Sequence, residues 1–88
     1  MQPSISQNER FKEDCKKYRA AIESTNNPHV KNEMTTLLTK LISEANRIDQ
    51  FYSEMTTGMG LTTHIEESRG SLSSIRKELE RHYTSLKS

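Results

Sequence analysis

The chain has 88 residues, a formal net charge of +1, 31% hydrophobic residues and one cysteine. This length allows one domain, and a hydrophobic content below the usual value of about 45–50% predicts a thin core. A single cysteine excludes an intramolecular disulfide, which is typical of a reducing compartment. Because the chain has neither an apolar run of about 18 residues nor a basic and apolar leader, we expect a cytoplasmic protein without a membrane span.

The first predicted helix covers residues 7–24. Ser6 followed by Glu9 has the spacing of a capping box. Apolar residues then recur at intervals of four and three, as on one narrow face of a helix: Phe11, Cys15, Tyr18 and Ile22. Because a nucleophilic thiolate needs a neighbouring base and a positively charged surrounding, we expect Cys15 to be a buried, inert thiol.

The central predicted helix covers residues 27–56 and is the longest. Asn27 is a suitable cap, and Pro28 is tolerated at the first helical position. The wide apolar stripe indicates contact with two neighbouring helices: Val30, Met34, Leu37, Leu38, Leu41, Ile42, Ala45, Ile48, Phe51, Tyr52 and Met55. Gly58 is suited to end this helix. Met59 and Leu61 in the following loop are expected to plug the end of the bundle; the alternative is an exposed, adaptable contact at the loop tip.

The third predicted helix covers residues 63–87. Thr63 and Glu66 form its predicted capping box. The stripe follows a heptad register with two polar members: Ile65, Ser68, Leu72, Ile75, Leu79, His82 and Leu86. Gly70 lies off the stripe, and glycine inside a helix costs about 1 kcal/mol, so a local break near Arg69 and Gly70 is an open alternative.

Short turns between helices favour antiparallel neighbours. We therefore predict an all-α protein, residues 1–88 forming one antiparallel three-helix bundle. The alternative is an extended helical hairpin, or coiled coil, that completes its core by oligomerising.

Candidate catalytic or metal-binding residues are sought among the histidine pairs and carboxylate pairs. In an antiparallel bundle His29 and His82 could approach each other, but structural metal sites usually have four ligands with recognisable spacing. The acidic pairs Glu66/Glu67 and Glu78/Glu80 lack the three- or four-residue spacing that stacks two carboxylates on one helix face, and no glycine-rich phosphate loop is present. We expect no enzyme, metal, cofactor or small-molecule substrate; a phosphorelay histidine at His64 or His29 is the remaining alternative.

The predicted function is a non-enzymatic protein–protein interaction module, a small adaptor or a subunit or chaperone of a larger assembly, that binds another protein or itself. Its expected interface is the part of the apolar stripes that the short first helix cannot cover: Ile48, Phe51, Tyr52, Met55, Met59, Ile65 and Leu72. The alternative is a nucleic-acid or anionic-surface binder, although such proteins usually have a clearly basic balance. It would use basic faces of the first and third helices: Lys12, Lys16, Arg19, Arg76, Lys77 and Arg81.

Overall fold

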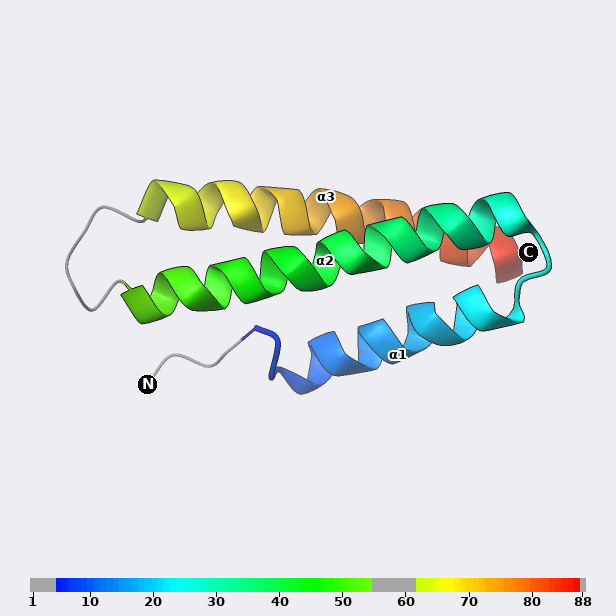
Figure 1. The fold of residues 1–88 in the computed structure, drawn as a ribbon, viewed down its shortest axis with the longest axis horizontal. Helices are drawn as coiled ribbons and strands as arrows, with labels where there is room; N and C mark the ends of the chain where they lie inside the picture. The colour runs from blue at the N-terminus through cyan, green and yellow to red at the C-terminus, as the bar shows by residue number, and fades with distance from the viewer. Residues whose placement is uncertain (1–4, 55–61, 88) are drawn as a thin grey trace.

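In the residues that it describes, the computed structural model contains three α-helices in an elongated bundle (Figure 1). They are α1 (Glu9–Ser24), α2 (Pro28–Glu54) and α3 (Thr62–Lys87), and α2 runs antiparallel to both α1 and α3. The structure describes residues 5–54 and 62–87. The most extensive packing joins α2 to α3, and α1 lies along part of both. The predicted all-α three-helix bundle is therefore confirmed.

The main core is built from the apolar stripes of all three helices. Its buried side chains are Tyr18, Ile22, Met34, Leu38, Leu41 and Leu79. Beyond this cluster Ala45, Ile48 and Ile65 are also buried, towards the end of the bundle where α2 and α3 extend past the start of α1 (Figure 1). The 16 residues of α1 are too few to cover the whole length of α2 and α3, which have 27 and 26.

The predicted cap of α2 is confirmed. The side-chain oxygen of Asn27 accepts hydrogen bonds from the backbone N–H groups of His29 at 3.0 Å and Val30 at 3.3 Å. These are two of the four N–H groups that the first turn of any helix leaves without an intrahelical partner. Pro28 then begins α2 at a position where its missing N–H costs nothing.

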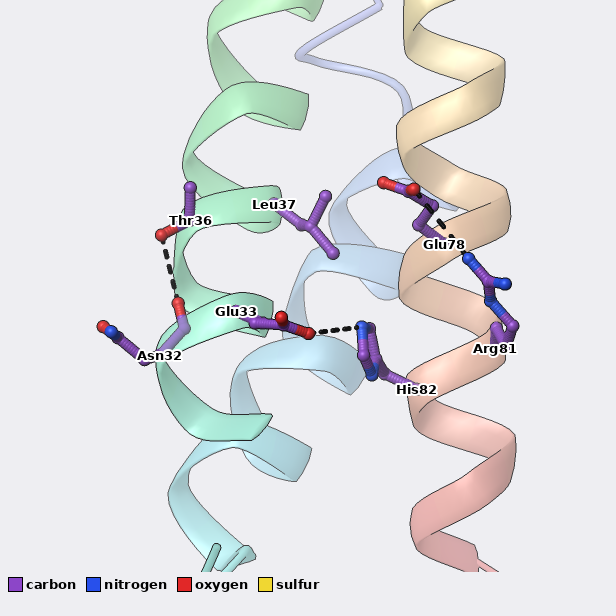
Figure 2. A pocket seen from close by; sticks show the side chains of 7 residues that line it. All are labelled: Asn32, Glu33, Thr36, Leu37, Glu78, Arg81 and His82. Carbon is purple, nitrogen blue, oxygen red and sulfur yellow. Dashed lines mark hydrogen bonds and ion pairs between the residues drawn. The ribbon is translucent and has the colours of Figure 1, made fainter. Parts of the chain in front are cut away.

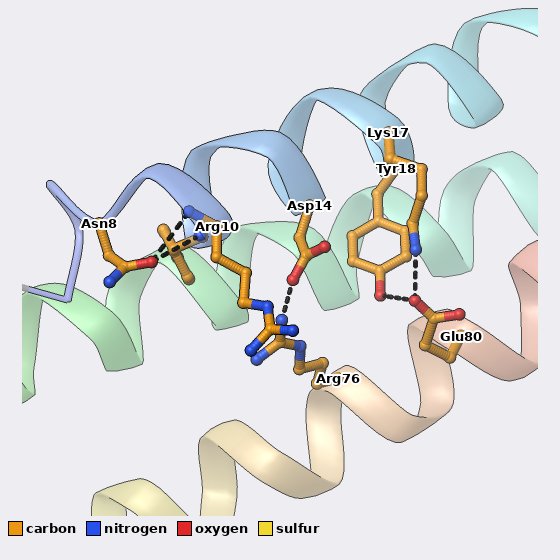
Figure 3. Close-up of polar contacts among 8 residues, drawn as sticks. Asn8, Arg10, Asp14, Lys17, Tyr18, Arg76 and Glu80 are labelled. Atoms are coloured by element: carbon orange, nitrogen blue, oxygen red, sulfur yellow. Dashed lines mark hydrogen bonds and ion pairs between the residues drawn. The ribbon is translucent and has the colours of Figure 1, made fainter.

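The predicted capping box of α1 is wrong. The cap is Asn8, whose side-chain oxygen accepts from the N–H groups of Arg10 at 2.9 Å and Phe11 at 3.3 Å (Figure 3). Ser6 lies two residues before this cap, and its hydroxyl donates to the Asp49 carboxylate on α2. The helix accordingly starts at Glu9, two residues later than the spacing predicted.

The start of α3 at Thr62 places Thr63 inside the first turn rather than at the predicted cap. The helix continues through Gly70 to Lys87 without a break, so the alternative of a break at Gly70 is wrong. A Cβ atom at Gly70 would meet nothing within 4 Å. The predicted helix end at residues 55–56, the Gly58 cap and the plug of Met59 and Leu61 lie outside the described residues.

Polar side chains tie α1 to α3 (Figure 3). One oxygen of the Glu80 carboxylate accepts from the Lys17 ammonium and from the Tyr18 hydroxyl, each at 2.5 Å. One turn away on each helix, the Arg76 guanidinium pairs with the Asp14 carboxylate. These two ties lie along the seam where α1 and α3 meet directly, and they fix the rotation of α1 against α3.

Candidate interaction surface

The seven residues of the predicted interface do not share one environment. Ile48 is 0% exposed and Ile65 is 5% exposed, so both are core side chains of this chain. Phe51, Tyr52 and Leu72 are half-buried. Met55 and Met59 lie outside the described residues. Among these seven residues, the accessible aromatic side chains are therefore Phe51 and Tyr52.

Each of the two aromatic rings on α2 is covered by a polar side chain of α3. The Phe51 ring stacks on the His64 imidazole, with ring centroids 5.7 Å apart and planes inclined by 29°. The Arg69 guanidinium lies over the Tyr52 ring, 5.7 Å from its centroid. At an exposed site a cation over an aromatic face contributes only about 0.5–1 kcal/mol. A partner that displaces these polar side chains in order to bury the rings more fully would therefore lose little free energy.

A small polar cavity of about 170 Å³ adjoins the Phe51–His64 pair. On its α2 side the Arg47 guanidinium lies 3.5 Å from the Glu44 carboxylate. Besides these residues it is lined by side chains of α3: Glu67, Ser68 and Ser71. An apolar ring beside hydrogen-bonding groups is the usual make-up of a protein contact surface, in which aromatic anchors are surrounded by a polar rim.

His29 and His82 do approach each other, through a carboxylate that the sequence analysis did not single out. The two oxygens of Glu33 lie 3.3 Å from Nε2 of His29 and 3.3 Å from Nε2 of His82. Figure 2 shows Glu33 and His82 facing each other across a groove between α2 and α3. The four-residue spacing of His29 and Glu33 on one helix was the signal available in the sequence. Among residues 5–54 and 62–87, no group of three or more His, Cys, Asp or Glu side chains is arranged to hold a metal ion.

The groove itself has a volume of about 430 Å³. Leu37 lies between the polar groups of the two helices, and on α3 the Arg81 guanidinium is 3.8 Å from the Glu78 carboxylate (Figure 2). Asn32 and Thr36 line the α2 side, and the Thr36 hydroxyl donates to the backbone oxygen of Asn32. Most of these polar side chains take part in hydrogen bonds or ion pairs within the protein, so the groove presents no single reactive group.

Three groups near the α1–α3 seam have altered acidity. The hydrogen bonds from Lys17 and Tyr18 lower the pKa of Glu80 below its usual range. Burial, reinforced by the hydrogen bond to Glu80, raises the pKa of Tyr18. Burial also raises the pKa of the half-buried Cys15 thiol, an effect that nearby Arg19 partly opposes. At neutral pH Cys15 is therefore a protonated thiol and a poor nucleophile.

The basic residues of the alternative surface are partly neutralised. Arg76 pairs with Asp14, and Arg81 lies near Glu78. Lys12, Lys16 and Arg19 are exposed on α1. Lys77 is exposed on α3. Two of the three basic residues that this surface would use on α3 therefore lie beside carboxylates, which weakens the positive charge that is the electrostatic signature of a nucleic-acid surface.

No known family model matches this chain, and comparison with the curated proteins and with the solved structures also gives no significant match. Within the described parts of the chain, none of the helices combines the length and the apolar character needed to cross a membrane.

Proposed function

We propose that this chain is a non-enzymatic protein–protein interaction module that serves as a small adaptor or subunit of a larger assembly. The observation that carries the proposal is the half-buried pair Phe51 and Tyr52, at the end of the α2–α3 hairpin that α1 does not reach. Aromatic side chains dominate binding energy where a partner seals them from water. Ile48 and Ile65, on the same two helices, are buried core residues.

The two side chains that cover the rings suit a surface that is accessible in the free chain and buried in a complex. His64 and Arg69 shield the ring faces in the free chain, yet both are exposed. On binding, a partner's apolar side chain would replace them on the rings, and their polar groups would move to the rim. This exchange keeps the free chain from exposing a large apolar patch, which would promote aggregation.

The test is a double variant, Phe51→Ser with Tyr52→Ser, compared with the single variant Leu86→Ser. Leu86 is exposed at the opposite end of the bundle, so its replacement removes a similar apolar group away from the proposed surface. Light scattering over a dilution series first shows whether the natural chain associates with itself. Association that the double variant loses while it keeps its helicity, and that Leu86→Ser retains, would support the surface.

If the natural chain is monomeric at every concentration, immobilised wild-type and variant chains are compared for the proteins they retain. We expect at least one protein that both wild type and Leu86→Ser retain and the double variant does not. Equal retention by all three chains, together with unchanged light scattering, would overturn the proposal.

A further inference from the structure

A second groove lies at the other end of the bundle, between the last turns of α1 and α3. Its volume is about 430 Å³, within the range of about 300–1,000 Å³ that is usual for small-molecule sites. Ala20 and Ala21 line the α1 side, and Tyr83 and Leu86 line the α3 side. The two alanines leave room between the helices because their side chains are short. Leu86 is 37% exposed and is the one large apolar side chain recorded as exposed within residues 5–54 and 62–87.

Two ammonium groups stand beside this apolar surface. The Lys17 and Lys87 Nζ atoms lie 4.7 Å and 4.9 Å from the centre of the same Tyr83 ring. The Tyr83 ring is held in place by an edge-to-face contact with buried Tyr18, 6.1 Å between centroids. The site therefore combines a fixed aromatic ring, an apolar wall and two positive charges.

The two charges are not equally compensated. The Lys17 ammonium is paired with Glu80 at 2.5 Å, whereas Lys87 has no ion pair with any residue that the structure describes. Two like charges that share one ring repel each other, and among the described residues only Glu80 forms an ion pair with either of them. A ligand with a single negative charge would bring the charges of this site into balance.

We propose that this groove binds a small amphipathic carboxylate, with its hydrocarbon part against Ala20, Ala21, Tyr83 and Leu86 and its carboxylate near Lys87. The single uncompensated ammonium fits a monoanion better than a phosphate dianion, which needs more donors. The groove is lined by the last turns of α1 and α3, whereas Phe51 belongs to the last turn of α2, which lies at the opposite end of the bundle (Figure 1). This ligand site is therefore independent of the proposed protein interface.

The experiment is an NMR titration of the ¹⁵N-labelled chain with octanoate, octan-1-ol and octylammonium. These probes have the same hydrocarbon chain and differ in the charge of the head group. We expect saturable shifts of the Ala20, Ala21, Tyr83 and Leu86 amides with octanoate, with a Kd on the order of 1 mM for a ligand of this size. An exposed ion pair should make octanoate about three- to fivefold tighter than octanol, and octylammonium should bind most weakly.

Two variants and two controls locate the site. Lys87→Gln should weaken the binding of octanoate by about three- to fivefold and leave the binding of octanol unchanged, because only the charge contact is lost. The control Lys40→Gln, at an exposed lysine on α2, should change the affinity for neither ligand. Ala20→Phe should fill the groove and abolish the shifts. Ser43→Phe, which adds the same ring at an exposed small residue on α2, should leave them in place.

Equal affinity for octanoate and octanol would overturn the assignment of an anionic ligand. Absence of saturable shifts at about ten times the expected Kd, where a site of that affinity would be nearly full, would overturn the site itself, as would shifts centred on Phe51 and Tyr52. Neither result would affect the proposed interaction function, because that function is tested at the other end of the bundle.

Discussion

The hydroxyl of Ser6 donates a 2.6 Å hydrogen bond to the carboxylate of Asp49, a residue 43 positions further along the chain. The same carboxylate accepts the backbone N–H groups of Ile5 at 2.6 Å and Ser6 at 3.1 Å. Three donors from two consecutive residues thus converge on one side chain of α2. This contact fixes where the chain enters α1 and holds the start of α1 against α2.

Replacement of Asp49 by alanine should lower the free energy of unfolding by about 1–2 kcal/mol, because hydrogen bonds to a charged group are stronger than neutral ones. Hydrogen exchange at the Ile5 and Ser6 amides should also become faster. Urea unfolding and NMR-detected exchange measure the two effects. Glu13→Ala, at an exposed carboxylate on α1, is the control and should leave the exchange of both amides unchanged. Unaltered exchange in the Asp49 variant would contradict the role of this carboxylate.

The Asn27 cap offers a prediction in which two substitutions differ. Asn27→Ala removes the side-chain oxygen that binds the His29 and Val30 N–H groups and should cost about 1 kcal/mol, whereas Asn27→Gly should cost only a few tenths. Circular dichroism during urea unfolding measures both. Asn26→Ala, one residue earlier, should have almost no effect. Equal losses for Asn26→Ala and Asn27→Ala would show that the cap contributes nothing specific.

Replacement of Gly70 by alanine should stabilise the protein by about 0.5–1 kcal/mol. The position lies inside a continuous helix, and the added Cβ meets nothing within 4 Å. Alanine therefore gains the helix propensity that glycine lacks without a steric cost. Thermal unfolding would show an increase in Tm, larger than that of Ser73→Ala on the same helix. A lower Tm for Gly70→Ala would mean that the free chain does use a break at this position.

The lowered pKa of Glu80 predicts that the stability of the protein decreases at acid pH. Its folded-state pKa is lowered by Lys17 and Tyr18, so the unfolded chain binds this proton more tightly than the folded chain. The resulting stability is present above the unfolded pKa of about 4.3 and is lost as the pH falls through the folded pKa. Urea midpoints measured from neutral to acid pH should fall less steeply for Glu80→Gln than for wild type. Glu23→Gln should follow the wild-type curve, and a parallel curve for Glu80→Gln would contradict the prediction.

Sequence spacing was sufficient to predict the three helices and most of the core. The side chains that share a helix face are set by the helical period alone, which is why Tyr18, Leu41 and Leu79 were placed correctly on the inner stripes. The Asn27–Pro28 start of α2 is likewise a local signal. The predicted first cap was wrong because Asn8, two residues after Ser6, caps α1. The bond from Ser6 to Asp49 spans 43 positions, which no local pattern could indicate.

The polar contacts between α1 and α3 and the candidate interaction surface were harder to predict from the sequence. Lys17 and Glu80 are 63 positions apart, so their contact depends on the register between α1 and α3. The stripe placed Ile48 and Ile65 on the inner faces of α2 and α3, but a pattern does not tell whether such residues are buried in the free chain or left for a partner to cover; here they are buried. The positions of His64 and Arg69 over the rings depend on the same cross-helix register.

Pro28 restricts how two copies of this chain could exchange their first helices. Such an exchange is simplest when the connection straightens and two helices fuse into one rod, which here would run from α1 into α2. The proline ring would then press against the carbonyl of Ser24, four residues earlier, and Ser24 would lose its bonding partner. The bend after Ser24, where the backbone of Thr25 is already extended, is therefore kept, and α1 folds back onto the helix that follows it in its own chain.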